Sequence, residues 1–147
     1  MTPNLSILRD WYTRVWENSD LDAMDELLLQ NTENSHAGGY SLIPNLVSEP
    51  NELREWITVF NSLVEDIRVT FVRTTEQGDW ISVMMEIHCR QIGTDKTICV
   101  NQQVTARIAG DRIAESYPAF DFIRFFEQLG QLPADCHALL LTGTRLH

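Results

Sequence analysis

The chain has 147 residues, 44% of them hydrophobic and 22% charged, which fits one folded domain and excludes disordered, repetitive and collagen-like classes. Twenty-one acidic against eleven basic side chains give a formal charge of −10, and that charge opposes binding to a polyanion such as nucleic acid. Because the sequence has neither an apolar run long enough to span a bilayer nor a recognisable signal peptide, we expect a cytoplasmic protein without a nucleic-acid or membrane partner.

Apolar side chains at three- and four-residue spacing predict a helix from about residue 4 to residue 17. Its stripe consists of Leu5, Leu8, Tyr12, Val15 and Trp16. Asn18 and Ser19 end this helix, and a second short helix is expected over residues 21–29, so that the two form a hairpin. The glycines and proline that follow predict a short strand around residues 33–37 and then a loop that carries Tyr40.

A third helix is expected to begin at Pro50, because proline suits the first turn of a helix. From residue 67 the apolar period changes to two, which predicts long strands. Turns at residues 77–79, 93–96 and 110–112 each contain a glycine able to adopt positive φ, so the strands should connect as antiparallel hairpins in a meander. A last strand over residues 112–119 leads into a short helix that ends at Gly130 and Pro133.

These elements predict one α+β domain over residues 1–147, with a core of about residues 5–133 and a short tail of residues 134–147. Four to five long antiparallel strands must twist and curl, so three helices would cover the apolar face of a curved sheet. We expect the result to be a cone that encloses a cavity.

Four stretches of the chain together resemble the SnoaL-like polyketide cyclases, a family within the nuclear transport factor 2-like fold group that includes ketosteroid isomerase. They are Tyr12–Asn18 with Leu21–Asp22, Gln77–Val83, Gly110–Tyr117, and Phe120–Asp121 with Gln128–Gly130. The resemblance implies a cone-shaped pocket that holds a hydrophobic substrate without a metal or organic cofactor. In cyclases of the family an aspartate just after the last long strand serves as acid and base in an intramolecular aldol closure, and Asp121 matches that position.

The sequence leaves two roles open for Asp121. As a catalytic base it would line the cavity among Phe120, Phe122 and Tyr117, where desolvation raises the pKa of a carboxyl group toward neutral pH. Alternatively, its place immediately before the last helix suits an N-cap that accepts backbone N–H bonds. A histidine present on the preceding strand of some cyclases is missing from residues 104–108.

Three further side chains are candidates to stabilise an enolate. Arg107 has the strand parity opposite to Val104, Ala106 and Ile108, so it points into the pocket or into solvent depending on which sheet face the helices cover. His36 lies between the second helix and the first strand, a position that often faces the pocket in the resembled fold group, and imidazole titrates near neutral pH, although a surface or loop histidine is the alternative. Tyr12 is a possible hydroxyl donor to a substrate carbonyl, as in ketosteroid isomerase, and it fits core packing equally well.

Aromatic side chains are the expected walls of the pocket, with ordinary core packing as the alternative. They are Trp16, Tyr40, Trp56, Phe60 and Tyr117. We expect no metal or cofactor, since the four histidines form no i, i+4 pair, the three cysteines form no C-x-x-C motif, and no phosphate-binding glycine loop is present. His88 shares a strand face with Glu86 and Arg90, which indicates the solvent or subunit side.

Two functions therefore fit the sequence. One is a cofactor-free cyclase or isomerase that acts on a small hydrophobic carbonyl compound; the other is a non-catalytic module of the same fold that binds a small ligand or a partner. An epoxide hydrolase of this fold is disfavoured, because it needs an Asp-Arg-Asp set and Arg107 has no acid two residues downstream. Trp80, Met84 and Ile92 on the outer sheet face further suggest a homodimer.

Overall fold

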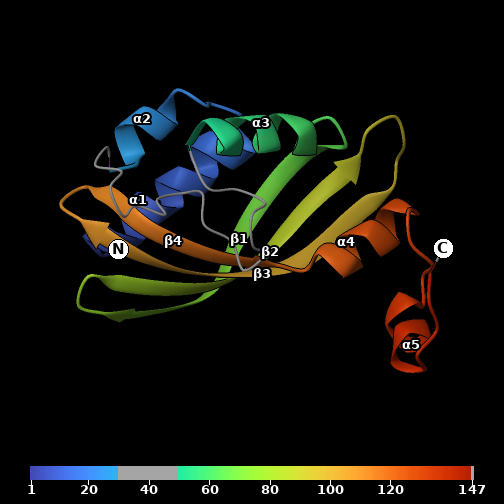
Figure 1. Cartoon of the computed structure of the whole chain (residues 1–147). Helices are drawn as coiled ribbons and strands as arrows, with labels where there is room; N and C mark the ends of the chain where they lie inside the picture. Colours follow the sequence, from blue (N-terminus) through green and yellow to red (C-terminus); the bar gives the residue numbers. More distant parts are fainter. Residues whose placement is uncertain (30–49, 147) are drawn as a thin grey trace.

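The structure is a computed structural model that describes residues 1–29 and 50–146. The strand predicted around residues 33–37, His36 and Tyr40 lie outside the described residues. In the described part, helices lie on one face of a curved antiparallel sheet (Figure 1), so the predicted α+β class is confirmed.

The first predicted helix is confirmed in extent but has two geometries. Helix α1 (Pro3–Asp10) is α-helical, and the chain continues without a break into η1 (Trp11–Glu17), which is a π-helix. Thr2 caps α1, because its hydroxyl oxygen accepts a 3.2 Å hydrogen bond from the backbone N–H of Leu5. Helix α2 (Ala23–Leu27) is shorter than predicted, and α3 (Pro50–Phe60) begins at the predicted proline.

The sheet is the predicted meander. Its strands are β1 (Val64–Gln77), β2 (Trp80–Gln91), β3 (Thr97–Ala109) and β4 (Arg112–Phe120), hydrogen-bonded antiparallel in chain order. The three hairpin turns place Gly78, Gly93 and Gly110 at positive φ, a conformation that glycine adopts without steric cost. The segment after α2 pairs with the β4 edge of the sheet, since the backbone N–H of Leu29 donates to the carbonyl of Ile113 at 2.9 Å.

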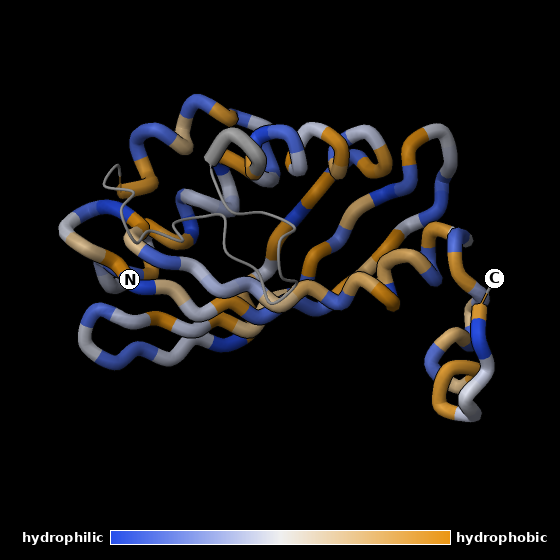
Figure 2. Tube along the Cα trace, viewed as in Figure 1, coloured by the Kyte–Doolittle hydropathy of each residue, from blue (hydrophilic) through white to orange (hydrophobic). Residues whose placement is uncertain are grey.

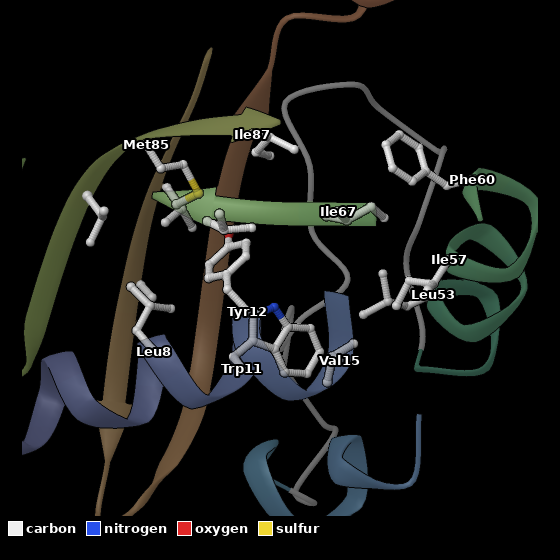
Figure 3. Packing of buried hydrophobic residues seen from close by; sticks show 14 of the residues in the cluster. Leu8, Trp11, Tyr12, Val15, Leu53, Ile57, Phe60, Ile67, Met85 and Ile87 are labelled. Carbon is white, nitrogen blue, oxygen red and sulfur yellow. The ribbon is translucent and has the colours of Figure 1, made fainter. Parts of the chain in front are cut away.

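The two faces of the sheet differ sharply in composition. On β2 and β3 every second side chain is buried against the helices, as period-two burial requires. The buried set on these two strands is Ile81, Val83, Met85, Ile87, Cys89, Ile98, Val100, Gln102, Val104, Ala106 and Ile108. The hydropathy-coloured trace shows hydrophobic and hydrophilic residues alternating along the strands (Figure 2), and buried side chains of η1 and α3 face the inner side of the sheet (Figure 3). The helix-covered face is called the inner face below, and the opposite face the outer face.

Two helices end the chain. Helix α4 (Phe122–Leu129) follows β4 directly and ends at Gly130, which has a left-handed conformation. Helix α5 (Cys136–Leu141) lies in the tail, where its first turn is held by a 2.9 Å hydrogen bond from the backbone N–H of Cys136 to the buried carboxylate of Glu127. Among the described helices, none is long and apolar enough to cross a membrane.

Candidate functional site

A polar pair lies within the apolar inner face. Tyr12 projects from η1 toward the sheet (Figure 3), and its hydroxyl oxygen accepts a 2.9 Å hydrogen bond from the side-chain amide of Gln102 on β3. Both side chains are buried, with exposed fractions of 3% and 8%. Burial raises the pKa of the Tyr12 phenol, and the hydrogen bond from Gln102 lowers it by less. The phenol therefore keeps its proton and is a neutral hydrogen-bond donor.

Gln102 is a site residue that the sequence analysis did not select. It has the strand parity of Val100 and Val104, so period two already placed it on the inner face among apolar neighbours. A polar side chain at such a position needs a hydrogen-bond partner, and Tyr12 supplies one. The sequence signal for Gln102 is that it is the polar residue among the apolar inner-face positions of β3.

Aromatic rings gather where η1, α3, β4 and α4 meet, and we call this group the aromatic wall. Its members are Trp16, Trp56, Phe60, Phe120, Phe122 and Phe125. Phe60 is central, because its ring centroid lies 5.5 Å from that of Trp16, 5.4 Å from Trp56 and 5.0 Å from Phe125. The structure thus brings together three of the predicted pocket aromatics, and it adds rings from β4 and α4.

Asp121 is exposed and caps helix α4. Its Oδ1 accepts a 3.0 Å hydrogen bond from the backbone N–H of Arg124, which is the contact expected of an N-cap. Its own N–H donates to the carbonyl of Asn101 on β3 at 3.3 Å. The structure therefore shows the capping role, and the catalytic role of Asp121 stays a prediction.

Arg107 and Tyr117 lie on the outer face, away from Tyr12 and the aromatic wall. Arg107 forms an ion pair with Glu115, and the Tyr117 hydroxyl donates to the same carboxylate at 2.7 Å. The Tyr117 ring stacks on Trp80 with centroids 6.4 Å apart. Because the helices cover the face of Val104 and Ile108, the inward orientation considered for Arg107 is not the one observed, and Tyr117 does not line the inner face.

An open surface depression of about 340 Å³ lies at the β2–β3 turn and is distinct from the predicted cavity. It is lined by Glu65, Arg90, Gly93, Thr94 and Asp95. Arg90 forms ion pairs with Glu65 at 2.8 Å and with Asp66 at 2.9 Å, so the one guanidinium among these lining residues is already paired. The thiol of the exposed Cys99 is no activated nucleophile, because desolvation and the nearby Glu86 carboxylate raise its pKa.

The sequence profile of the SnoaL-like domain matches residues 8–116, which is most of the chain. The chain belongs to the SnoaL-like family. The match spans η1, α2, α3, strands β1 to β3 and the first part of β4, and therefore both members of the Tyr12–Gln102 pair. Among curated proteins, none matches the sequence.

Solved structures similar to this SnoaL-like protein share its fold at low sequence identity. A candidate polyketide cyclase from Bacillus cereus is 15% identical, with a TM-score of 0.73 over 88% of this chain and 82% of that one. A protein with a ketosteroid isomerase-like fold from Catenulispora acidiphila is 17% identical, with a TM-score of 0.66 over 88% and 95%. An epoxide hydrolase of Mycobacterium tuberculosis is 12% identical, with a TM-score of 0.64 over 97% of both chains.

Proposed function

We propose that this SnoaL-like protein binds a small hydrophobic carbonyl compound between the helices and the inner face of the sheet, and catalyses a cofactor-free proton transfer on it of the cyclase or isomerase type. One observation carries the proposal. The amide of Gln102 donates to the Tyr12 hydroxyl, so the phenol oxygen has an amide donor and its own hydrogen is available to a ligand. Within the described residues, no acceptor is recorded for that hydrogen.

A buried neutral phenol suits the chemistry of a carbonyl compound. Removal of a proton next to a carbonyl places negative charge on the oxygen, and a hydrogen-bond donor fixed in a water-poor site stabilises that charge. The Gln102 amide strengthens the donor, because a phenol that accepts a hydrogen bond is polarised toward giving its own. Tyr12 therefore acts as the donor to the carbonyl oxygen and, after proton removal, to the enolate.

The aromatic wall supports a flat, hydrophobic substrate. Trp16 and Trp56 are only partly buried, so their rings keep surface that a ligand would cover. Aromatic rings bind flat apolar ligands through large contact areas and through stacked or edge-to-face geometry. We assign the wall to substrate binding together with Tyr12.

Asp121 is the proposed base. It lies between Phe120 and Phe122, two members of the aromatic wall, and its cap on α4 uses one carboxylate oxygen, Oδ1. The second oxygen is then the one that takes the proton. His36 stays a further candidate outside the described residues.

A non-catalytic ligand-binding module is the second candidate function. The observation that favours it is the exposure of Asp121, whose carboxylate caps helix α4 at the surface of the protein. Both functions place a ligand at Tyr12 and the aromatic wall, and they differ only in turnover.

Exchange of α-protons for deuterium separates the two functions. 2-Tetralone, a flat hydrophobic ketone, is incubated with the protein in deuterated buffer, and loss of its α-proton signals is followed by NMR. An enzyme accelerates the exchange, and Tyr12→Phe lowers the rate by about 10²–10³-fold, the usual loss for one oxyanion donor. Tyr117→Phe on the outer face is the matched control and leaves the rate unchanged. Saturable binding without accelerated exchange supports the binding module.

We further propose that the protein is a homodimer that pairs through the outer face. Trp80 and Met84 lie on this face of β2 with exposed fractions of 37% and 44%. Exposed large apolar side chains on one sheet face are typical of an interaction surface.

A further inference from the structure

Three side chains of the kinds that bind transition metals meet on the outer face of the sheet. Glu86 and His88 come from β2 and Cys99 from β3, and their ligand atoms all lie within 4.8 Å of one another. His88 Nε2 is 3.1 Å from Glu86 Oε2 and 3.9 Å from Cys99 Sγ. We call these three residues the Glu-His-Cys cluster.

The register between β2 and β3 places these three side chains next to one another. Glu86 and His88 are two residues apart on β2, so both project from one face, and Cys99 lies directly opposite His88 on β3. The backbone N–H and carbonyl of Cys99 both bond to the side chain of Gln128, at 3.0 and 2.8 Å, on the side of β3 away from β2. His88 and Cys99 are therefore a non-hydrogen-bonded antiparallel pair, the type in which facing side chains are closest.

The observed distances are close to those of a tetrahedral zinc site. Bond lengths of about 2.3 Å to sulfur and about 2.0–2.1 Å to nitrogen and oxygen place tetrahedral neighbours about 3.6 Å apart for S···N and about 3.4 Å apart for N···O. The corresponding distances here are 3.9 and 3.1 Å, a difference of a few tenths of an ångström for each. Small rotations of exposed side chains close such gaps.

We propose that the Glu-His-Cys cluster binds one Zn²⁺ ion per chain, with Glu86, His88 and Cys99 as ligands and a water molecule in the fourth position. The donor set of one carboxylate oxygen, one imidazole nitrogen and one thiolate sulfur is suited to a borderline-soft ion such as zinc. Binding replaces the thiol proton of Cys99, which leaves to solvent, and the thiolate and carboxylate then balance the charge of the ion. The chain's formal charge of −10 also favours a cation.

The site is independent of the function proposed above. It lies on the outer face, whereas Tyr12 and Gln102 lie on the inner face. Along β2, Glu86 follows Met84 on the outer face, so the site adjoins the proposed dimer surface at Met84 and lies away from Trp80. The ion would join β2 to β3 where Arg90 and Thr97 approach their connecting turn.

Calorimetric titration with zinc chloride tests the site in the full-length protein, with its cysteines kept reduced by a phosphine. One ion is expected per chain, and Cys99→Ser and His88→Gln are each expected to weaken binding by at least about tenfold. Glu86→Gln is expected to weaken it by less, because a neutral amide remains a possible ligand. His137→Gln and Glu55→Gln, which change exposed side chains on helices, are matched controls that retain wild-type affinity.

Cobalt(II) supplies a readout on the unmodified protein. A thiolate ligand gives a near-ultraviolet sulfur-to-cobalt charge-transfer band, which is expected in the wild type and absent in Cys99→Ser. The proposal is overturned if saturating Co²⁺ produces no such band in the wild type. It is equally overturned if zinc binds with the same affinity to Cys99→Ser and His88→Gln, since both substitutions are at exposed positions and circular dichroism confirms their fold.

Discussion

Gln102 and Tyr12 join the inner face of strand β3 to helix η1 through a 2.9 Å hydrogen bond between buried side chains. This bond fixes the orientation of the phenol within a core whose other members are almost all apolar. The amide donates to the phenol oxygen, and no side chain of residues 1–29 or 50–146 accepts the hydroxyl hydrogen, which we assign to a ligand. The contact therefore fixes the position of the proposed donor, and burial of the phenol keeps it protonated.

Removal of the Tyr12 hydroxyl should destabilise the fold. In Tyr12→Phe the amide of Gln102 loses its acceptor, and a buried donor without a partner costs about 1–3 kcal/mol of unfolding free energy. The double variant Tyr12→Phe/Gln102→Leu should recover part of that loss, because no unsatisfied donor remains. Urea denaturation measures both. Equal stability of wild type and Tyr12→Phe would show that the hydrogen bond contributes nothing.

Asp121→Ala should weaken helix α4. The variant removes the acceptor for the Arg124 N–H, and loss of an N-cap typically costs about 1 kcal/mol. Asp121→Ser keeps a capping oxygen and should retain most of the stability, while it removes the proposed base. Thermal unfolding combined with the deuterium exchange assay therefore separates the structural role from the catalytic one. A stable Asp121→Ser protein with undiminished exchange would exclude Asp121 as the base.

Stability should decline in alkaline solution in part through Cys89. Burial raises the pKa of this thiol to about 11 from an ordinary value of 9.0. The folded state thus holds the proton where the unfolded chain releases it, so the contribution is fully present below pH 9 and is lost as the pH rises through about 11. Urea unfolding at several pH values should show a smaller decline between pH 9 and 11 for Cys89→Ala than for wild type. Parallel profiles would contradict this assignment.

The proposed dimer makes a simple prediction for the outer face. Trp80→Ser/Met84→Ser removes the two large apolar side chains of this part of β2 and should convert a dimer into a monomer, as measured by light scattering after size exclusion. Val59→Ser changes a more exposed apolar residue on helix α3 and serves as the control. A monomeric wild type at micromolar concentration, or a dimeric double variant, would argue against pairing through this face.

Local periodicity predicted the fold well because each strand and helix buries one regular set of side chains. The spacing of Leu8, Tyr12 and Val15 located the first helical segment, and the glycines at positive φ located the hairpins. The π geometry of η1 was not predicted, since apolar spacing does not distinguish it from an α-helix. Periodicity also left the orientation of Arg107 undetermined. Alternation shows which residues of a strand share a face of the sheet, but it does not show which face the helices cover.

Side-chain contacts between residues far apart in the chain could not be predicted from the sequence. His88 and Cys99 are eleven residues apart and were treated as unrelated, since a search for metal ligands by spacing along the chain finds neither an i, i+4 histidine pair nor a C-x-x-C motif. They meet because the β2–β3 register places them opposite each other. Likewise, Tyr12 and Gln102 are ninety residues apart, and only packing of η1 onto β3 joins them.

The most direct test of the proposed function is the infrared carbonyl stretch of bound 2-tetralone labelled with carbon-13 at its carbonyl. A hydrogen bond from Tyr12 weakens the C=O bond, so the band should move to lower frequency on binding to the wild type and should return toward its value in an apolar solvent in Tyr12→Phe. An identical band in the two proteins would contradict the assignment of Tyr12 as the donor to the substrate carbonyl.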